Sequence, residues 1–188
     1  MPKPLPTDGV QAKDGDTIVL LFGKYNPAHM GYFRALEALV RRPVAEIWVT
    51  PLYSLFPIEH VQNMCTILST EASVATKRQV GCCLAGLKGF LRIDEFLPWC
   101  RSKYPGLRFV SAKLCGFQRS DKADIEVRFA GQELSSGKDD VYVPQFLPVP
   151  QDLAERIGSG SDESRNFLAP IWEYVQKHRL YRGSHGQV

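Results

Sequence analysis

The chain has 188 residues and a formal net charge of +3 at pH 7, which suffices for one domain with a sizeable core and does not by itself indicate a nucleic-acid surface. Its five cysteines are odd in number and lack Cys-x-x-Cys spacing, which argues against a disulfide framework or a cysteine metal site and indicates a reducing compartment. No apolar run approaches membrane-spanning length, and the first 16 residues lack the apolar segment of a secretory signal, so we expect a soluble, cytoplasmic protein that binds neither nucleic acid nor membranes.

The first part of the chain predicts a strand–helix–strand unit. Residues 1–15 contain three prolines and no periodic pattern, which indicates a flexible arm before a single domain over 16–182 and a short tail over 183–188. Residues 17–22 form a continuous apolar run, typical of a parallel strand covered on both faces. A helical pattern over 31–41 follows, and residues 45–50 predict a second strand. Such a unit places ligands at the carboxyl ends of its strands.

The middle of the chain is less regular. Residues 52–75, which include Pro57 and His60, are compatible with a flexible lid or a short helix. Residues 76–85 predict a helix with two basic residues, Lys77 and Arg78, in its first turn. The following predictions are a helix up to Tyr104 and strands at 107–112, 124–129 and 141–148, with an excursion over 132–140. The prolines of the last strand favour an edge position or an early end of the strand. Asp152 is a candidate N-cap for a short helix over 153–157.

The loop between the first strand and the first helix carries the most specific signal. Residues 23–32 read Gly-Lys-Tyr-Asn-Pro-Ala-His-Met-Gly-Tyr, so they bring backbone N–H groups and His29 to a helix N-terminus, which favours phosphate. They resemble the G-S/T-F-N/D-P-x-H-x-G-H signature of the nucleotidyltransferase superfamily, and most closely that of nicotinamide/nicotinate mononucleotide adenylyltransferases. The matching residues are Gly23, Asn26, Pro27, His29 and Gly31, with Tyr25 near the motif's Phe. Lys24 and Tyr32 depart from it, and Tyr32 replaces a histidine that is a phosphate ligand in that family.

The C-terminal segment provides a second resemblance to the same family. Residues 164–181 resemble the S-I-R-Y-L-V-P-x-x-V-x-x-Y-I-x-x-H-x-L-Y ending of these enzymes, with matches at Leu168, Pro170, Tyr174, His178, Leu180 and Tyr181. Fourteen residues before Pro170 stands Arg156, the position of the Arg in the family's I-S-x-T-x-I-R phosphate motif. The hydroxyl residues of that motif are missing, and Gln151, Asp152 and Leu153 stand there instead. Residues 158–161 are an alternative phosphate loop, and Arg165 is an alternative cation.

The resemblance, which extends over about residues 17–181, implies an α/β fold of Rossmann-like nucleotidyltransferase type, with a central, mostly parallel sheet flanked by helices. It also implies adenylyl transfer from ATP to nicotinamide or nicotinate mononucleotide, with Mg²⁺ accompanying ATP and no protein metal site. The implied catalytic residues are His29, Tyr32 and Lys24, and the implied ATP- and phosphate-binding residues are Phe22, Gly23, Tyr25, Asn26, Gly31 and Arg156. Lys77 and Arg78, where the family has a basic residue opening a helix, are candidates for the mononucleotide, with a solvated helix end as the alternative. Trp99 can stack on a ring or belong to the core.

Two other functions stay open. Tyr32, the missing hydroxyl residues and Lys113, where the family has a carboxylate after the strand, favour a degenerate member that binds nucleotide or a protein partner without turnover. A nucleotidyltransferase with another phosphorylated acceptor is the third reading, although the Leu180-Tyr181 ending favours the mononucleotide branch. The sequence does not decide between the amide and acid mononucleotides, nor whether the chain forms a homo-oligomer.

Overall fold

The computed structural model describes residues 12–117, 128–129, 140–145 and 149–182. Within these ranges, six strands form one sheet in the order β3-β2-β1-β4-β6-β5. The strands are β1 (Thr17–Gly23), β2 (Glu46–Pro51), β3 (Val80–Cys82), β4 (Arg108–Phe117), β5 (Arg128–Phe129) and β6 (Asp140–Gln145). All neighbours pair in parallel except β5, which pairs antiparallel with β6.

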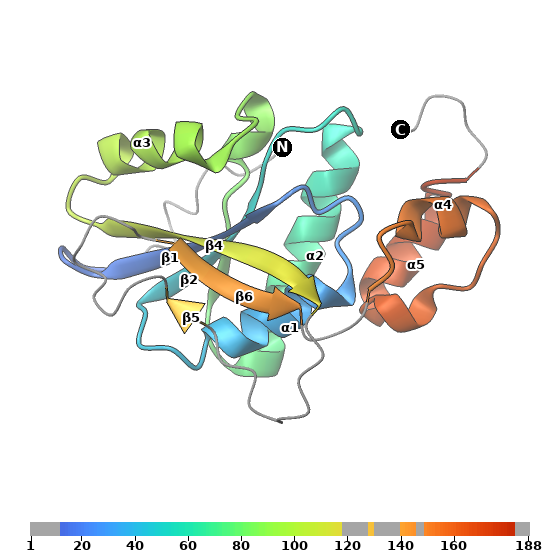
Figure 1. Ribbon diagram of the computed structural model, residues 1–188, viewed down its shortest axis with the longest axis horizontal. Helices are drawn as coiled ribbons and strands as arrows, with labels where there is room; N and C mark the ends of the chain where they lie inside the picture. Colours follow the sequence, from blue (N-terminus) through green and yellow to red (C-terminus); the bar gives the residue numbers. More distant parts are fainter. Residues whose placement is uncertain (1–11, 118–127, 130–139, 146–148, 183–188) are drawn as a thin grey trace.

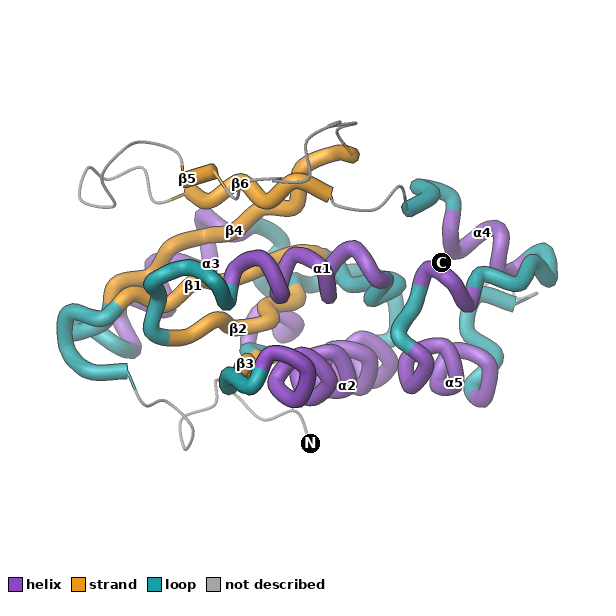
Figure 2. Tube along the Cα trace, turned by 90° about the horizontal axis from the view of Figure 1, so that it is seen from below, coloured by secondary structure: helices purple, strands orange, loops and turns teal. Residues whose placement is uncertain are grey.

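Helices cover both faces of the sheet (Figure 1). Seen from below, α1 and α2 lie across one face, with α3 behind the sheet and α4 and α5 together at one end (Figure 2). The α-helices are α1 (Met30–Leu39), α2 (Ile58–Thr76), α3 (Ile93–Lys103), α4 (Leu153–Gly158) and α5 (Ala169–Lys177), and two 3-10 turns are η1 (Ala85–Lys88) and η2 (Ser164–Asn166). In the part of the chain that the structure describes, no helix is long and apolar enough to span a membrane.

The continuous apolar run of β1 reflects burial on both faces. Val19 and Leu21 belong to the core under α1 and α2, whereas Ile18 and Leu20 belong to a second core with Trp48 of β2 and Phe96 of α3. All four β1 side chains are fully buried. The predicted α/β fold, with a mostly parallel sheet flanked by helices, is therefore confirmed.

The predicted strand–helix–strand unit is present with the expected parallel pairing. β1 pairs with β2 in a register that places Val19 opposite Ile47 and Gly23 opposite Pro51. Helix α1 connects the two strands and buries its apolar face, including Phe33, Leu36 and Leu39. The loop from β1 to α1 therefore lies at the carboxyl edge of the sheet, where parallel α/β sheets bind ligands.

Residues 52–76 differ from the prediction of a lid or short helix. They contain α2, which has 19 residues, the longest of the described helices. Its buried positions Val61, Met64, Cys65, Leu68 and Ala72 follow the helical period and pack against α1 and the sheet. Pro57 stands at the N-cap position, where it does not interrupt the helix.

The helix predicted over 76–85 is wrong, because α2 already ends at Thr76. Lys77 has a left-handed conformation (φ 56°) that terminates α2, and residues 80–82 form strand β3 beside β2. Arg78 therefore opens a strand rather than a helix.

The last strand does not lie at an edge of the sheet, which was one of the two alternatives that its prolines suggested. Strand β6 stands between β4 and β5, but β5 pairs only with Val141 and Tyr142. Pro144 lies beyond that pairing, next to the irregular register between β4 and β6, so its missing N–H does not interrupt a regular ladder. Of the strand predicted over 124–129, only the last two residues are described, and the excursion over 132–140 lies outside the described residues apart from its last position.

Two parts of the chain far from each other in sequence anchor the ends of the domain. Gly15 N–H donates to the carbonyl of Gly106 (2.8 Å), and residues 1–11 of the predicted arm lie outside the described residues. At the other end, Leu180 is fully buried after α5.

Asp152 stands at the N-cap of α4 as predicted, although its side chain does not bond to the helix N–H groups.

Candidate active site

His29 stands at the junction of the loop and α1, where it is the N-cap of the helix. Its Nδ1 accepts a hydrogen bond from the Gly31 N–H (3.0 Å). A nitrogen that accepts carries no proton, so the neutral ring has its proton on Nε2. Burial lowers the pKa of His29 from 6.5 to about 4. At neutral pH the loop therefore presents an uncharged N–H donor at Nε2, beside the N-terminus of α1.

Tyr32 packs directly against this histidine. Its ring stacks on His29, with centroids 4.6 Å apart, and on Tyr25, with centroids 4.1 Å apart. A Cβ added to Gly23 would lie 2.8 Å from the Tyr32 hydroxyl oxygen, so the phenol requires a glycine at the end of β1. Burial raises the pKa of Tyr32 to about 12, and the group is a neutral phenol at every physiological pH.

Two other residues of the motif shape the loop. Tyr25, with φ 50°, buries its ring completely and donates its hydroxyl to the carbonyl of Leu21 (2.5 Å). Tyr25 can thus offer a ligand only its backbone, because its side chain belongs to the core. The Asn26 Oδ1 accepts from the Tyr181 hydroxyl (2.5 Å), which ties the C-terminal segment to the loop. The peptide bond between Asn26 and Pro27 is cis.

A cavity of about 400 Å³ lies at the carboxyl edge of the sheet beside the loop. It sits where the connections from β1 and β4 diverge, which is the ligand-binding position of open α/β sheets. The lining comes from the end of β1 and the residue after it, from the residue after β2, from β4, and from the two residues before α3 together with the first turn of that helix. The lining residues are Phe22, Gly23, Lys24, Leu52, Leu91, Arg92, Ile93, Asp94 and Lys113. Lys24 donates its Nζ to the carbonyl of Tyr53 (2.6 Å) at this cavity.

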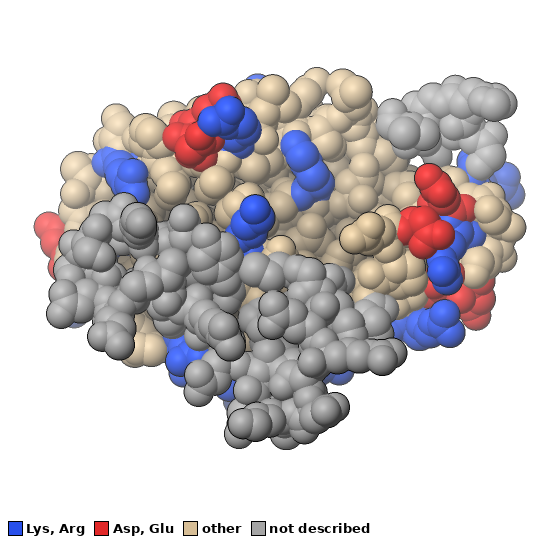
Figure 3. Space-filling view, in the orientation of Figure 1, with Lys and Arg blue, Asp and Glu red and all other residues tan. Residues whose placement is uncertain are grey.

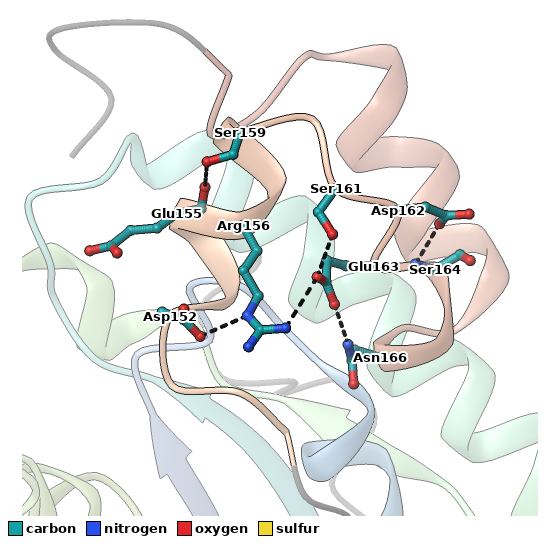
Figure 4. A network of polar contacts seen from close by, with 9 residues as sticks. All are labelled: Asp152, Glu155, Arg156, Ser159, Ser161, Asp162, Glu163, Ser164 and Asn166. Atoms are coloured by element: carbon teal, nitrogen blue, oxygen red, sulfur yellow. Dashed lines mark hydrogen bonds and ion pairs between the residues drawn. The ribbon is translucent and has the colours of Figure 1, made fainter.

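Arg156 on α4 is bound to carboxylates (Figure 4). Its Nε donates to Asp152 Oδ1 (2.9 Å), and its Nη1 lies 3.8 Å from Glu163 Oε1. Glu163 is only 1% exposed and also accepts from Ser161 Oγ (2.8 Å) and Asn166 Nδ2 (2.7 Å). The Arg156 side chain is 44% exposed, so a solute can still reach it.

Helix α4 lies close to the β1–α1 loop through the C-terminal segment. A Cβ added to Gly158 would lie 2.5 Å from the Tyr181 carbonyl oxygen, so α4 packs on Tyr181. The Tyr181 hydroxyl in turn reaches Asn26 of the loop. Figures 1 and 2 both place α4 and α5 on the side of the molecule from which α1 starts. The convergence of His29 and Arg156 on one triphosphate stays a prediction.

The residues predicted to bind the mononucleotide do not join this site. Arg78 donates Nη1 to the carbonyl of Val40 (2.6 Å) and Nη2 to the carbonyl of Val44 (2.6 Å), just before β2 starts. It also lines a second cavity of about 360 Å³ with Asp16 and Glu46, at the amino edge of the sheet. Arg78 and its neighbour Lys77 thus lie at the edge opposite His29, and the helix that would have aimed them at the substrate does not exist.

Trp99 belongs to the packing of α3. Its ring stacks on Phe96, with centroids 5.3 Å apart, and the Lys103 Nζ lies 5.6 Å from its centroid. Trp99 does not line the cavity at the carboxyl edge. Of the two alternatives for Trp99, stacking on a ligand ring or packing in the core, the structure supports packing in the core.

Sequence patterns missed three features of this region. Glu163 and the cavity residue Arg92 lie in segments without a recognisable motif. His60 is partly buried, and its Nδ1 lies 2.8 Å from the Tyr174 hydroxyl, which also accepts from Asn63 Nδ2 (2.9 Å). This contact joins α2 to α5. Apart from the helical period of α2, no signal in the sequence could have shown it.

The charged side chains around the site are dispersed. On the face drawn in Figure 3, basic side chains stand singly on a largely uncharged described surface, and acidic ones gather beside basic ones at its edges. Among the described residues, no three His, Cys, Asp or Glu side chains form a group that could hold a metal ion.

Comparisons with known proteins bear on the fold. No protein-family model matches the sequence, and no curated protein matches it either. A solved structure assigned as a nicotinate-nucleotide adenylyltransferase from Vibrio parahaemolyticus is similar, with 15% identity, coverage of 90% of this chain and 97% of that chain, and a TM-score of 0.66. The nicotinic acid mononucleotide adenylyltransferase of Plasmodium falciparum is similar in its complex with APC (13% identity, TM-score 0.60) and in its complex with NaAD (14% identity, TM-score 0.61), each covering 88% of this chain and 97% of that chain. Such identities establish the fold alone. The chain has the fold of the nicotinate-nucleotide adenylyltransferases, as its two sequence motifs predicted.

Proposed function

We propose that this protein transfers an adenylyl group from MgATP to the phosphate of a pyridine mononucleotide and releases pyrophosphate. The observation that carries the proposal is the geometry of His29, a neutral N–H donor that caps α1 at the carboxyl edge of the sheet. The fold shared with nicotinate-nucleotide adenylyltransferases supports the same reaction class.

The reaction needs no protein nucleophile. An oxygen of the mononucleotide phosphate attacks the α-phosphorus of ATP, a new P–O bond forms, and the bond to the leaving pyrophosphate breaks. The protein contributes position and charge stabilisation. Mg²⁺ arrives with ATP and neutralises its phosphate oxygens, so the substrate rather than a protein metal site supplies the cation.

The side chains divide this work. His29 donates its Nε2–H to a phosphate oxygen, and the backbone N–H groups from Gly23 to Tyr25 and at the start of α1 bind others. Arg156 binds the pyrophosphate end when it exchanges a carboxylate partner for phosphate. Tyr32 offers a neutral hydroxyl where the motif has a histidine, and a neutral donor stabilises developing charge less than a charged one. The cavity lined by Phe22 and Lys24 receives the mononucleotide.

A second candidate is nucleotide binding without turnover. Two observations favour it: Asp152 and Glu163 already neutralise Arg156, and Tyr32 buries its ring against His29. Both features weaken charge stabilisation more than they weaken binding to backbone N–H groups.

The deciding experiment measures pyrophosphate release with MgATP and either the nicotinate or the nicotinamide mononucleotide. We expect turnover above background in the parent protein and its loss in His29→Asn, because Asn retains an acceptor for the Gly31 N–H but cannot replace the Nε2–H donor. His178→Ala is the matched control, since His178 is exposed after α5. Pyrophosphate release at background level by the parent protein with both mononucleotides would refute the enzymatic function. If the protein still binds ATP in that case, nucleotide binding without turnover is favoured.

A further inference from the structure

Tyr181, which follows α5, contacts three segments that are distant from one another in the sequence. Its hydroxyl donates to Asn26 Oδ1 in the β1–α1 loop (2.5 Å). Its ring stacks on Phe56, between β2 and α2, with centroids 5.1 Å apart and an interplanar angle of 12°. Its carbonyl oxygen packs on Gly158 at the end of α4, where an added Cβ would lie 2.5 Å away. One residue thus joins the candidate phosphate loop to the helix that carries Arg156.

The backbone that presents Tyr181 has an uncommon conformation. Arg179 has φ 50° and Tyr181 has φ 66°, both in the left-handed region that residues with a side chain rarely adopt. Between them Leu180 is fully buried, and its N–H donates to the carbonyl of Val175 (3.0 Å). Conformations of this kind persist only where the surrounding contacts determine them, and they are common at functional sites. The buried Leu180 and the contacts of Tyr181 therefore hold this side chain in one place against the loop.

The hydrogen bond to Asn26 has a defined direction. Burial raises the pKa of the Tyr181 hydroxyl above its ordinary value, so the group stays protonated and can donate at every physiological pH. Asn26 accepts through Oδ1 and therefore presents its Nδ2 N–H groups on the other side of the amide. None of the residues that the structure describes accepts a hydrogen bond from this nitrogen. These N–H groups are available to a ligand of the loop, and a phosphate oxygen is a strong acceptor for them.

The bond from Tyr181 reaches a part of the loop that its other anchors do not hold. Tyr25 ties the start of the loop to β1 through its hydroxyl bond to the Leu21 carbonyl. His29 closes the end of the loop as the N-cap of α1. Between these two points, and among the described residues, the bond from Tyr181 to Asn26 is the one side-chain hydrogen bond that comes from another part of the chain. The orientation of the Asn26 amide therefore depends on the Tyr181 hydroxyl.

We propose that Tyr181 is a positioning residue that orients Asn26 and the β1–α1 loop for the triphosphate of ATP. This inference rests on the proposed function, because ATP is the substrate whose phosphates the loop would bind. A donor that is held in place before the ligand arrives binds it more tightly than a donor that must be ordered on binding. Tyr181 acts through Asn26 and needs no contact with the nucleotide itself.

The test measures the affinity for MgATP by titration calorimetry, without a mononucleotide, so it does not depend on turnover. Tyr181→Phe removes only the hydroxyl and keeps the ring that stacks on Phe56. We expect it to weaken MgATP binding roughly three- to tenfold, as the loss of one hydrogen bond provides. Tyr174→Phe is the matched control, because the Tyr174 hydroxyl bonds to His60 and Asn63 of α2 and not to the loop. Its affinity for MgATP should stay within about twofold of that of the parent protein.

A double-mutant cycle with Asn26→Ala separates positioning of the loop from a general loss of stability. If Tyr181 acts through Asn26, Tyr181→Phe should weaken MgATP binding by less than about twofold in the Asn26→Ala background. Urea unfolding of the two tyrosine variants measures how much stability each has lost. We expect both variants to be folded and destabilised, and only Tyr181→Phe to bind MgATP more weakly.

The outcomes separate this inference from the proposed function. Unchanged MgATP affinity in Tyr181→Phe, an equal loss in Tyr174→Phe, or the full effect of Tyr181→Phe in the Asn26→Ala background overturns the role of Tyr181. If Tyr181→Phe does not fold, Asn26→Ala removes the same hydrogen bond from the loop, and unchanged affinity in that variant overturns the inference as well. A parent protein that does not bind MgATP overturns both the inference and the proposed function. Binding that depends on Tyr181 without pyrophosphate release overturns only the enzymatic function.

Discussion

The state of His29 makes a prediction about stability that needs no substrate. In the folded protein burial holds its pKa at about 4, whereas an unfolded chain has the ordinary value of 6.5. Between these two values the unfolded state binds more protons than the folded state, so stability falls as the pH falls. The free energy of unfolding that depends on a neutral, buried His29 is fully present above pH 6.5 and is lost as the pH approaches 4. A difference of 2.5 pKa units corresponds to about 3 kcal/mol in total, of which about 2 kcal/mol is lost by pH 5.

The measurement compares the parent protein with His29→Asn. Asparagine is a good N-cap and can accept from the Gly31 N–H, but it does not titrate. Urea unfolding at several pH values from 8 to 5 gives the free energy of unfolding of each protein. We expect the parent protein to lose about 2 kcal/mol relative to the variant over this range. His60, whose pKa burial also lowers, is present in both proteins and cancels. Free energies that stay parallel with pH, or an NMR spectrum that places the neutral proton on Nδ1, would refute this account of His29.

Four further substitutions test other parts of the structure. Arg78→Met removes hydrogen bonds to backbone carbonyls before β2 and should cost about 2–3 kcal/mol in urea unfolding while leaving mononucleotide affinity unchanged; weakened binding would contradict its position at the opposite edge. Glu163→Ala leaves the buried Asn166 amide without its acceptor and should cost about 1–3 kcal/mol, with Glu163→Gln intermediate; equal stability of all three proteins would argue against a structural role of the buried Glu163. Asp152→Ser frees one side of Arg156 and should raise affinity for MgATP about two- to fivefold, the worth of an exposed ion pair; no change would indicate that Arg156 does not meet the triphosphate. Tyr32→His should raise the rate of pyrophosphate release, and a rate at or below that of the parent protein would show that the phenol is not what limits it.

The sequence predicted the sheet well where hydrophobic burial determines the pattern. The β1 run is apolar because both of its faces are buried, and a covered parallel strand is the simplest structure with that property. Helix α2 was predicted only as a lid or a short helix although its buried residues follow the helical period, because polar and apolar residues mix in this segment and Pro57 suggested an irregular structure. Strand β3 has only three residues, too few for a period to be visible.

The candidate site was predictable only where one short segment builds it. The motif of residues 23–32 predicted His29 at the start of α1, because capping depends on neighbours in sequence. The partners of Arg156 depend partly on the turn that brings the buried Glu163 back to α4, and periodicity does not encode such a turn. The helix predicted over 76–85 was wrong because α2 already ends at Thr76, and the apolar residues Val80, Leu84 and Ala85 that suggested a helix belong to β3 and to the start of η1.

The departures from the motif have a common electrostatic consequence. Tyr32 places a neutral phenol where a histidine would stand, and its stacking on His29 contributes to the burial that keeps that imidazole uncharged. Asp152 and Glu163 offset the charge of Arg156, so the groups expected to meet the triphosphate carry little net positive charge. Lys24 and Lys113 instead place positive charge around the cavity proposed for the acceptor. On the proposed function, Mg²⁺ and the backbone N–H groups of the loop therefore carry most of the stabilisation of the triphosphate.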